Sequence, residues 1–222
     1  MDDSMKDKPL HVVVLAAGEG KRMNSDLPKV LQPIGGKPML AHLLETALAL
    51  DPACVHVVIG HAAEQVLALL KTLADERIAT VQQRRRLGTG HAVQQAMGEI
   101  PESARVMVLP GDMPLVRSET LTTFAGLEAP LAILSFEASN PHGYGRILRD
   151  AEGRVFGIRE QRDTSAAEAR ITEVNSGVLA ADAGSLADWL ERVDNDNAQG
   201  EYYLTDCIGL AAADGATVEA MC

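Results

Sequence analysis

Several features of membrane, secreted and metal-binding proteins are missing from this sequence of 222 residues. No apolar run approaches the roughly 18 residues that a membrane-spanning helix needs. The polar, acidic start MDDSMKDKP does not have the character of a signal peptide. The three cysteines, Cys54, Cys207 and Cys222, are widely spaced and form no metal-binding pattern. We therefore expect a protein of the reducing cytoplasm.

An excess of positive charge is missing as well, because the formal net charge is −11. The acidic excess lies in residues 101–222, with 9 Lys and Arg against 20 Asp and Glu, whereas residues 1–100 contain 11 of each kind. An acidic protein is a poor general binder of nucleic acid. The run Arg84-Arg85-Arg86 is too short to indicate a nucleic-acid patch, and we assign it no role. Any phosphate site must therefore be built from local cations.

Short apolar runs and amphipathic segments alternate along the chain, as is typical of βαβ units. A length of 222 residues with 46% hydrophobic residues suffices for one α/β domain with a sizeable core. Strands are predicted at 10–17, 55–59, 78–82, 105–109 and 131–137, with a hairpin formed by 143–147 and 155–160. Helices are predicted at 38–50, 62–73, 118–127, 185–193 and 204–214, and a further helix begins near 88–90. We expect a largely parallel sheet.

The first predicted strand is followed at once by Gly18 and Gly20 and then by the cations Lys21, Arg22 and Lys29. Glycine allows the backbone to approach a ligand closely, its N–H groups can point at an anion, and fixed cations neutralise the anion. This loop therefore predicts a phosphate site. A simple turn after the strand is the alternative, and the clustered cations disfavour it.

Two well-known phosphate loops do not fit this stretch. A P-loop would need glycine at Leu15 and Ser or Thr at Arg22. A dinucleotide fingerprint would need glycine at Met23 and an acid near the end of the second strand, where Ile59-Gly60-His61 stands.

The stretch LAAGEGKRMNSDLPKVL (residues 15–31) resembles the signature L-A-A-G-x-G-T-R-M-x-S-D-x-P-K of sugar-nucleotide pyrophosphorylases. It is most similar to the bacterial bifunctional N-acetylglucosamine-1-phosphate uridyltransferases/glucosamine-1-phosphate acetyltransferases, from whose signature only Lys21 departs. Further blocks resemble that family at 87–92 (LGTGHA), 111–112 (GD), 143–147 (GYGRI), 173–179 (EVNSGVL) and 197–206 (NAQGEYYLTD). The resemblance implies a Rossmann-like nucleotidyltransferase fold, with a mostly parallel mixed sheet and helices on both faces.

The resemblance also implies a reaction. UTP and N-acetylglucosamine 1-phosphate would give UDP-N-acetylglucosamine and pyrophosphate by Mg²⁺-assisted in-line displacement at the α-phosphate, for peptidoglycan and lipopolysaccharide precursors. No Ser-His-Asp or Cys-His set is evident, and an ionised phosphate nucleophile needs no general base. A cytidylyl- or guanylyltransferase, which shares the opening loop, is one alternative. A nucleotide-sugar-binding fragment with weak or no catalysis is another.

Residue roles follow from the same resemblance. Arg22 and Lys29 would be catalytic. The nucleotide would contact Leu15, Ala16, Ala17, Gly18, Lys29, Gln83, Gly88 and Thr89. The sugar side would include Gly111, Asp112, Gly145, Glu160, Asn175, Glu201, Tyr203 and Thr205, and Asp112 would bind Mg²⁺.

The residue types suit several of these roles. Gln83 and Asn175 each offer a donor and an acceptor, for a base edge and for a sugar group. Asp112 lies just past a buried strand, where α/β sheets bind ligands, and Mg²⁺ favours one or two carboxylates with substrate phosphates. The plainer alternatives are a helix cap for Thr89 and a turn for Asp112. Trp189 is expected in the core.

Apart from Lys21 and the run 84–86, where the family usually has fewer basic residues, the sequence departs from the family in two places. Pro110 stands where the family has an aromatic residue, which puts a contact from that side chain in doubt. In the family a further strand leads to a G-V-N-N segment, whose asparagine is the second Mg²⁺ ligand, and then to a left-handed β-helix. We find neither, and no hexapeptide repeat. We therefore expect residues 1–222 to be a uridyltransferase domain truncated at its carboxyl end, monomeric where the full-length family member is a homotrimer.

Overall fold

The computed structural model describes residues 8–18, 20, 25 and 27–222. Arg22 and Lys21, two of the cations of the predicted phosphate loop, lie outside these residues. Within the described part of the chain, the longest and most apolar helices still fall short of what a membrane crossing needs.

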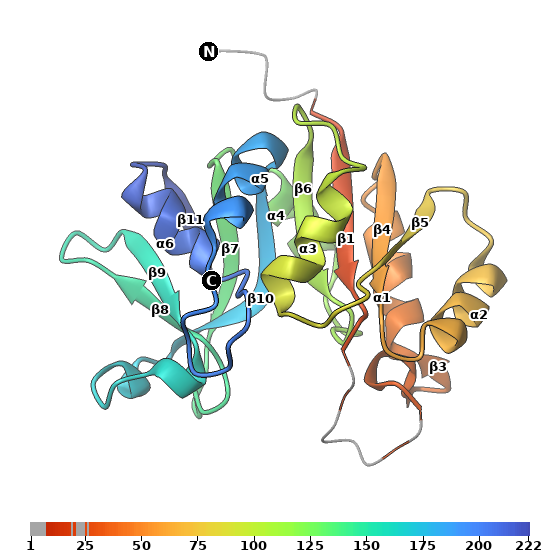
Figure 1. The fold of residues 1–222 in the computed structure, drawn as a ribbon, viewed down its shortest axis with the longest axis horizontal. Helices are drawn as coiled ribbons and strands as arrows, with labels where there is room; N and C mark the ends of the chain where they lie inside the picture. Colours follow the sequence, from red (N-terminus) through yellow and green to blue (C-terminus); the bar gives the residue numbers. More distant parts are fainter. Residues whose placement is uncertain (1–7, 19, 21–24, 26) are drawn as a thin grey trace.

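The described residues form a nine-stranded sheet, and seven of its strands lie in the order β11-β7-β10-β6-β1-β4-β5 (Figure 1). Only β10 on this path runs antiparallel to its neighbours. In chain order these strands are β1 (Leu10–Leu15), β4 (Cys54–Ile59), β5 (Ile78–Gln82), β6 (Arg105–Pro110), β7 (Leu131–Glu137), β10 (Glu173–Asp182) and β11 (Val218–Met221). The hairpin of β8 (Arg146–Arg149) and β9 (Val155–Arg159) joins β10, and β2 (Pro33–Ile34) pairs separately with β3 (Lys37–Pro38).

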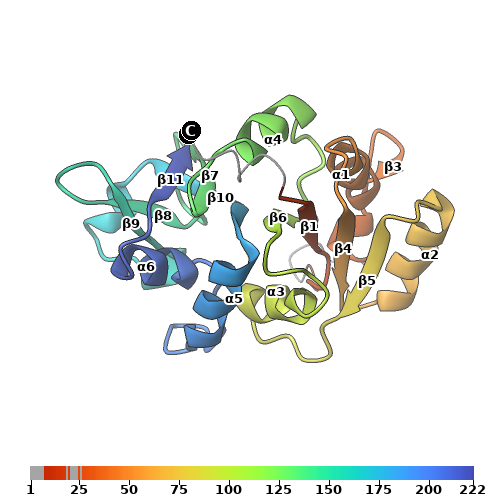
Figure 2. The same cartoon turned by 90° about the horizontal axis from the view of Figure 1, so that it is seen from above.

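Helices cover both faces of this sheet. One apolar core contains residues of α1 (Met39–Leu48), α2 (Ala63–Leu73) and α4 (Ser118–Ala125), and the other contains residues of α3 (Thr89–Met97), α5 (Ala183–Arg192) and α6 (Asp206–Ala213). Figure 2 shows α1 and α4 on the side opposite α3 and α5. Short 3-10 helices η3 (Lys29–Leu31), η4 (Gln161–Asp163) and η5 (Glu168–Arg170) lie in the connections. The predicted α/β fold is confirmed.

The apolar run at the start of β1 has a direct structural cause. Val12 and Val14 point into the core beneath α1, whereas Val13 points into the core beneath α3, and all three are fully buried. A strand buried on both faces needs apolar residues at every position rather than at alternate ones. The prediction that Trp189 belongs to the core is also confirmed, since it is 4% exposed and its Nε1 donates to Asp214 Oδ2 at 3.0 Å.

Two strands of the sheet were not predicted. The segment 173–182 forms β10, and Val218–Met221 forms β11, which pairs in parallel with β7. The register of β10 against β7 shifts between Asn175 and Leu179, where Gly177 has a φ of +89°. A Cβ at Gly177 would lie 2.7 Å from Pro110 Cγ. This irregular segment therefore fits closely against the end of β6.

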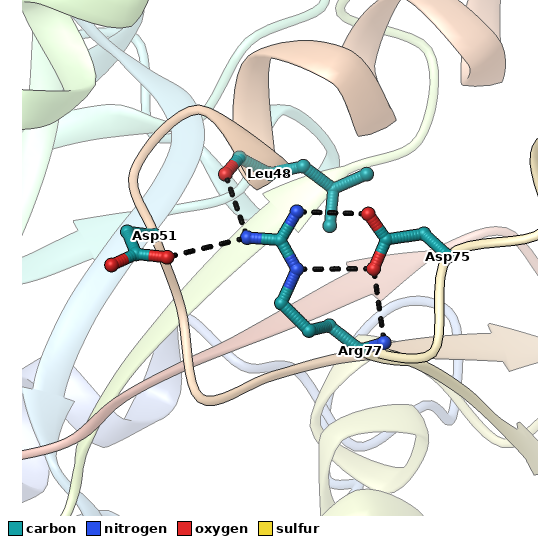
Figure 3. Close-up of polar contacts among 4 residues, drawn as sticks. All are labelled: Leu48, Asp51, Asp75 and Arg77. Atoms are coloured by element: carbon teal, nitrogen blue, oxygen red, sulfur yellow. Dashed lines mark hydrogen bonds and ion pairs between the residues drawn. The ribbon is translucent and has the colours of Figure 1, made fainter.

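Ion pairs and hydrogen bonds occupy the edge of the sheet where its parallel strands begin. Arg77 donates from Nε and Nη2 to Asp75 (3.0 and 2.8 Å), and from Nη1 to the Leu48 carbonyl (3.3 Å) and Asp51 (3.4 Å), as Figure 3 shows. This cluster joins the end of α1 to the loop before β5. At the same edge, Arg105 at the start of β6 pairs with Asp182 at the end of β10, with Nη1 3.2 Å from the carboxylate.

Candidate active site at the carboxyl edge of the sheet

A cavity of about 900 Å³ opens at the opposite edge, where β1, β5 and β6 end and β10 begins. Twelve of the residues predicted for the site line it, from both halves of the chain. They are Leu15, Ala17, Gly18, Lys29, Gln83, Gly88, Thr89, Asp112, Glu160, Asn175, Glu201 and Thr205. Parallel strands bring their carboxyl ends to one edge, so segments far apart in sequence meet there. The structure thus brings these residues together, while their roles toward a ligand stay predictions.

Four predicted residues do not line the cavity. Ala16 is 1% exposed and its N–H donates to the Val58 carbonyl at 2.9 Å. Gly111 lies against the end of β1, where its N–H donates to the Leu15 carbonyl at 2.9 Å. Tyr203 is buried, and Gln199, which does line the cavity, donates to its hydroxyl at 2.7 Å. Gly145, the fourth, lies behind Glu160. These residues support the wall from behind.

Lys29 and Asp112 meet at the centre of the site, where Lys29 Nζ forms an ion pair with Asp112 Oδ2. Their side chains are 42% and 31% exposed, so both remain accessible to a ligand. Lys29 begins η3, and a Cβ at Gly20 would lie 2.7 Å from Lys29 Cβ, which explains the glycine there. Pro110, Lys29 and Asp112 also line a second cavity of about 960 Å³, which extends toward α4, Met221 and Cys222.

Asp112 is the predicted ligand of Mg²⁺. Among the described residues no group of three or more His, Cys, Asp or Glu side chains could hold a metal. Mg²⁺ characteristically keeps several waters and takes one or two carboxylates together with substrate phosphates. Asp112 fits that pattern as one carboxylate at the cavity, with Lys29 as the neighbouring counter-charge.

The wall with Gln83, Gly88 and Thr89, called the nucleotide wall after its predicted role, is held by hydrogen bonds to the segment before α6. Gly90 N–H donates to the Tyr202 carbonyl (2.8 Å), and Leu204 N–H donates to Thr89 Oγ1 (3.0 Å). Gly88 has a φ of +115°, and a Cβ there would lie 2.4 Å from the Tyr202 carbonyl oxygen. Only glycine fits at this position. Thr89 therefore has a structural function in addition to its predicted ligand contact.

Gln83 is oriented by its own hydrogen bonds. Its Nε2 donates to the Gly88 carbonyl (3.0 Å) and lies 3.0 Å from His91 Nδ1. Burial and the charge of Arg85 lower the pKa of His91, which favours a neutral ring able to accept that bond. The amide donors of Gln83 are thus engaged, and among the described residues its Oε1 accepts no hydrogen bond. Gln83 can offer an acceptor to a ligand N–H.

The wall with Glu160, Asn175 and Thr205, called the sugar wall after its predicted role, is a connected set of residues. Asn175 N–H donates to the Gly145 carbonyl (2.8 Å), and Thr205 Oγ1 donates to Glu160 Oε1 (3.0 Å). A Cβ at Gly145 would lie 2.8 Å from Ile158 Cγ2 and 3.4 Å from Glu160 Oε1. Glycine at this position therefore lets the strand approach Glu160 closely.

Acidic groups near this wall have raised pKa values. Burial is the main cause for Glu160, the hydroxyl of Thr205 opposes it, and Asp163 adds to it. Burial and the charges of Asp194, Glu160 and Asp163 raise the pKa of Asp206 to about 6. Ionised carboxylates that are short of water accept hydrogen bonds strongly, which suits the predicted contact of Glu160 with a ligand.

Sequence analysis missed three polar residues of the cavity lining: Arg86, Arg162 and Gln199. Arg86 belongs to the basic run to which we had assigned no role. Its position three residues after Gln83 was the available signal, and the departure of that run from the family pattern hid it. Arg162 and Gln199 lie in connections whose course the predicted elements did not define.

The chain is similar to known proteins over most of its length. The chain is 56% identical over 206 residues to the bifunctional protein GlmU of Xanthomonas oryzae, and 54% identical over 215 residues to that of Alkalilimnicola ehrlichii. These matches cover 93% and 96% of the chain but 45% and 46% of the relatives. The chain thus spans about half the length of the curated relatives it matches.

The fold itself is shared with more distant structures. A UDP-glucose pyrophosphorylase crystallised with UDP-glucose superposes with a TM-score of 0.79 at 17% identity, over 96% of this chain and 91% of the other. HddC from Yersinia pseudotuberculosis gives a TM-score of 0.69 at 21% identity, over 95% and 89%. The sequence profile of the MobA-like NTP transferase domain matches residues 12–170, and the chain belongs to that family.

Proposed function

We propose that this chain is a uridyltransferase, which makes UDP-N-acetylglucosamine and pyrophosphate from UTP and N-acetylglucosamine 1-phosphate. The observation that carries the proposal is that Lys29 and Asp112 line the same cavity as Gln83, Glu160 and Asn175. The relatives named GlmU, similar over almost the whole chain, support the same substrates.

The nucleotide wall favours uracil over cytosine. Uracil carries an N–H at position 3, and Gln83 Oε1 is the acceptor that its orientation leaves available. Cytosine has an acceptor at position 3, which would face another acceptor. A buried polar group left without its partner costs about 1–3 kcal/mol, enough for roughly tenfold discrimination or more.

The reaction needs little acid–base chemistry, because the attacking phosphate oxygen is already ionised near neutral pH. It needs two anions to be held in line despite their repulsion. Two unit charges about 4 Å apart repel by roughly 4 kcal/mol at an effective dielectric of 20. Lys29 lies where it can offset this repulsion, and Arg22, by family resemblance, would do the same for the β- and γ-phosphates. Asp112 would hold Mg²⁺, which when bound neutralises further phosphate charge.

Pyrophosphate release in a coupled assay tests the proposal directly. The folded 222-residue chain would be supplied with N-acetylglucosamine 1-phosphate and, separately, UTP, CTP or GTP, each with Mg²⁺ and with EDTA. Of these mixtures, we expect turnover only in the one that contains UTP and Mg²⁺. The rate should fall at least about tenfold in Arg22→Ala. A preference for CTP or GTP would make the chain a different nucleotidyltransferase. Tight binding of UDP-N-acetylglucosamine without turnover would make it a binding protein.

A further inference from the structure

Arg146 is a buried cation of the GYGRI block to which no function has been assigned. Its side chain is 2% exposed, and it belongs to the largest fully buried side chains of the molecule. Nη1 donates to the Tyr144 carbonyl, and Nη2 donates to Gln161 Oε1 at 3.0 Å. Its Nε is buried without a hydrogen-bond partner, and within the described residues no carboxylate forms an ion pair with Arg146.

A buried charge without a counter-ion is unfavourable, and an apolar side chain of similar volume would often stabilise the fold as well or better. Packing alone therefore does not account for arginine at this position. What arginine adds is a planar fork that can hold two acceptors from different segments in a fixed geometry. Here the two acceptors come from the loop before β8 and from η4, which follows β9.

Both segments lead directly to the sugar wall. Gln161 follows Glu160 directly in the chain, and its Oε1 also accepts from Gly143 N–H (2.7 Å). Gln161 therefore links Glu160 to the loop of Gly143–Gly145. The Gly145 carbonyl accepts from Asn175 N–H (2.8 Å), and its Cα faces Glu160 closely. Arg146 and Gln161 thus connect Gly145 and Glu160 from behind, without lining the cavity themselves.

We propose that Arg146, acting through Gln161 and the Tyr144 carbonyl, is a positioning residue. It sets the affinity of the sugar wall for the sugar part of the ligand. The inference rests on the proposed function for the identity of the ligand. The nucleotide wall is held by a separate set of bonds, from Gly90 to Tyr202 and from Leu204 to Thr89. Loss of the arginine fork therefore weakens binding of the sugar phosphate ester and leaves binding of the nucleoside triphosphate unchanged.

Steady-state kinetics of Arg146→Met and Gln161→Met test this separation. We expect each variant to raise KM for N-acetylglucosamine 1-phosphate by roughly tenfold, the effect of one or two hydrogen bonds, with KM for UTP within about twofold of wild type. The double variant should be no worse than the more severe single variant, because both act through one chain of contacts. Gln161→Glu, which keeps the acceptor, should restore the wild-type KM.

Arg149→Met is the matched control. Arg149 lies on the same strand but pairs with Glu173 at 2.8 Å, and it makes no contact with Gln161. It should change neither KM. If Arg146→Met does not fold, Gln161→Met, a less buried position, still decides the question. Equal rises in both KM values, or additive effects in the double variant, would show that Arg146 only stabilises the fold.

A binding measurement separates this inference from the proposed function. Calorimetry gives the Kd of UDP-N-acetylglucosamine and of UDP for each protein, and their ratio isolates the sugar contribution. We expect the ratio to change roughly tenfold in Gln161→Met with the Kd of UDP unchanged. An unchanged ratio overturns the role of Arg146 even when wild type turns over normally. Absence of wild-type turnover with a changed ratio overturns the proposed activity and leaves the role of Arg146 standing.

Discussion

The two edges of the central sheet place their charged residues in different surroundings. Where the parallel strands begin, Arg105 pairs with Asp182, which also accepts from Lys8 (3.0 Å), and Arg77 pairs with Asp75. Where the same strands end, Lys29 also pairs with Asp112, but this pair and Glu160 line a cavity. The strands are shared, so the difference lies in the connections. We expect the pairs of the first edge to stabilise the fold and those of the second to serve a ligand.

The two edges also differ in how protons affect them. His11 and His56 lie side by side in the first half of β1 and β4, with Nδ1 and Nε2 3.0 Å apart, and burial lowers both pKa values. Near the cavity the pKa values of Glu160 and Asp206 are raised instead. A lower pH therefore destabilises the fold at the histidine pair. Near the cavity it protonates the buried carboxylates and so removes the cost of burying their charge. The two edges should therefore respond to pH in opposite directions, which unfolding experiments can measure.

The largest expected effect is the loss of activity in Asp112→Asn. Asp112 would hold Mg²⁺ in the proposed reaction, so removing its charge should lower kcat by roughly 10²–10³-fold, as for other electrostatic groups of active sites. The midpoint of thermal unfolding should stay near that of wild type, because Asp112 is partly exposed and, among the described residues, forms an ion pair with Lys29 alone. Asp182→Asn is the control from the other edge, with reduced stability and unchanged kcat. A similar loss of kcat in both variants would refute the division between the edges.

The largest expected effect on stability is that of Arg105→Met. Its side chain is 9% exposed, and it donates to Asp182 and to the carbonyls of Leu127 and Pro130 (3.3 and 3.4 Å). Removing one partner of a buried pair should lower the free energy of unfolding by about 3 kcal/mol. Urea unfolding measures this. Arg77→Met, which breaks the more exposed cluster of Figure 3, should have a clearly smaller effect. Equal losses would mean that burial does not set the energy of this edge.

Sequence analysis predicted most of the parallel part of the sheet because its signals are local. The apolar run of β1, the glycines after it and the amphipathic face of α1 each lie within a few residues. The same holds for much of the site, since residues that follow parallel strands meet at one edge. Asp112 was predicted on that ground, Lys29 from the cationic loop and Gln83 from the family resemblance, and the structure brings all three to one cavity.

What sequence analysis missed depends on contacts between distant segments. β10 passes between β6 and β7, and its register shift at Gly177 follows from the approach of Pro110, which no local pattern records. β11 has only four residues and depends on β7 for its hydrogen bonds. The burial of Tyr203 likewise results from tertiary packing. Such features have no periodic signal in the sequence.

A moderate effect on stability is expected from Asp206→Asn. A carboxyl group whose folded pKa, about 6, lies above its unfolded value of 3.8 stabilises the fold below pH 3.8 and loses that contribution as pH rises through 6. At pH 8 the buried charge therefore opposes folding, and its removal should raise the free energy of unfolding by at most about 1 kcal/mol, since the charge also favours the start of α6.

Urea unfolding at pH 8 and pH 4 checks the sign of this effect. The variant should be more stable than wild type at pH 8 and should lose that advantage at pH 4. Glu119→Gln, at the first turn of α4, is a control for the loss of a carboxylate near a helix start. A less stable Asp206→Asn at pH 8 would mean that its carboxylate is well solvated.

The smallest effect near neutral pH is expected from the histidine pair. A folded pKa below the unfolded 6.5 means that the unfolded chain binds more protons, so stability is fully present above pH 6.5 and falls as the pH drops below it. For His56 burial is the main cause, the charge of His11 adds to it, and Glu99 opposes it. His56→Gln keeps a hydrogen-bonding side chain but cannot be protonated, so its unfolding free energy should depend less on pH between 7.5 and 5.5. His61→Gln, at an exposed position, should retain the wild-type dependence of unfolding free energy on pH. If all three proteins show the same dependence, the acid sensitivity does not arise from the histidine pair.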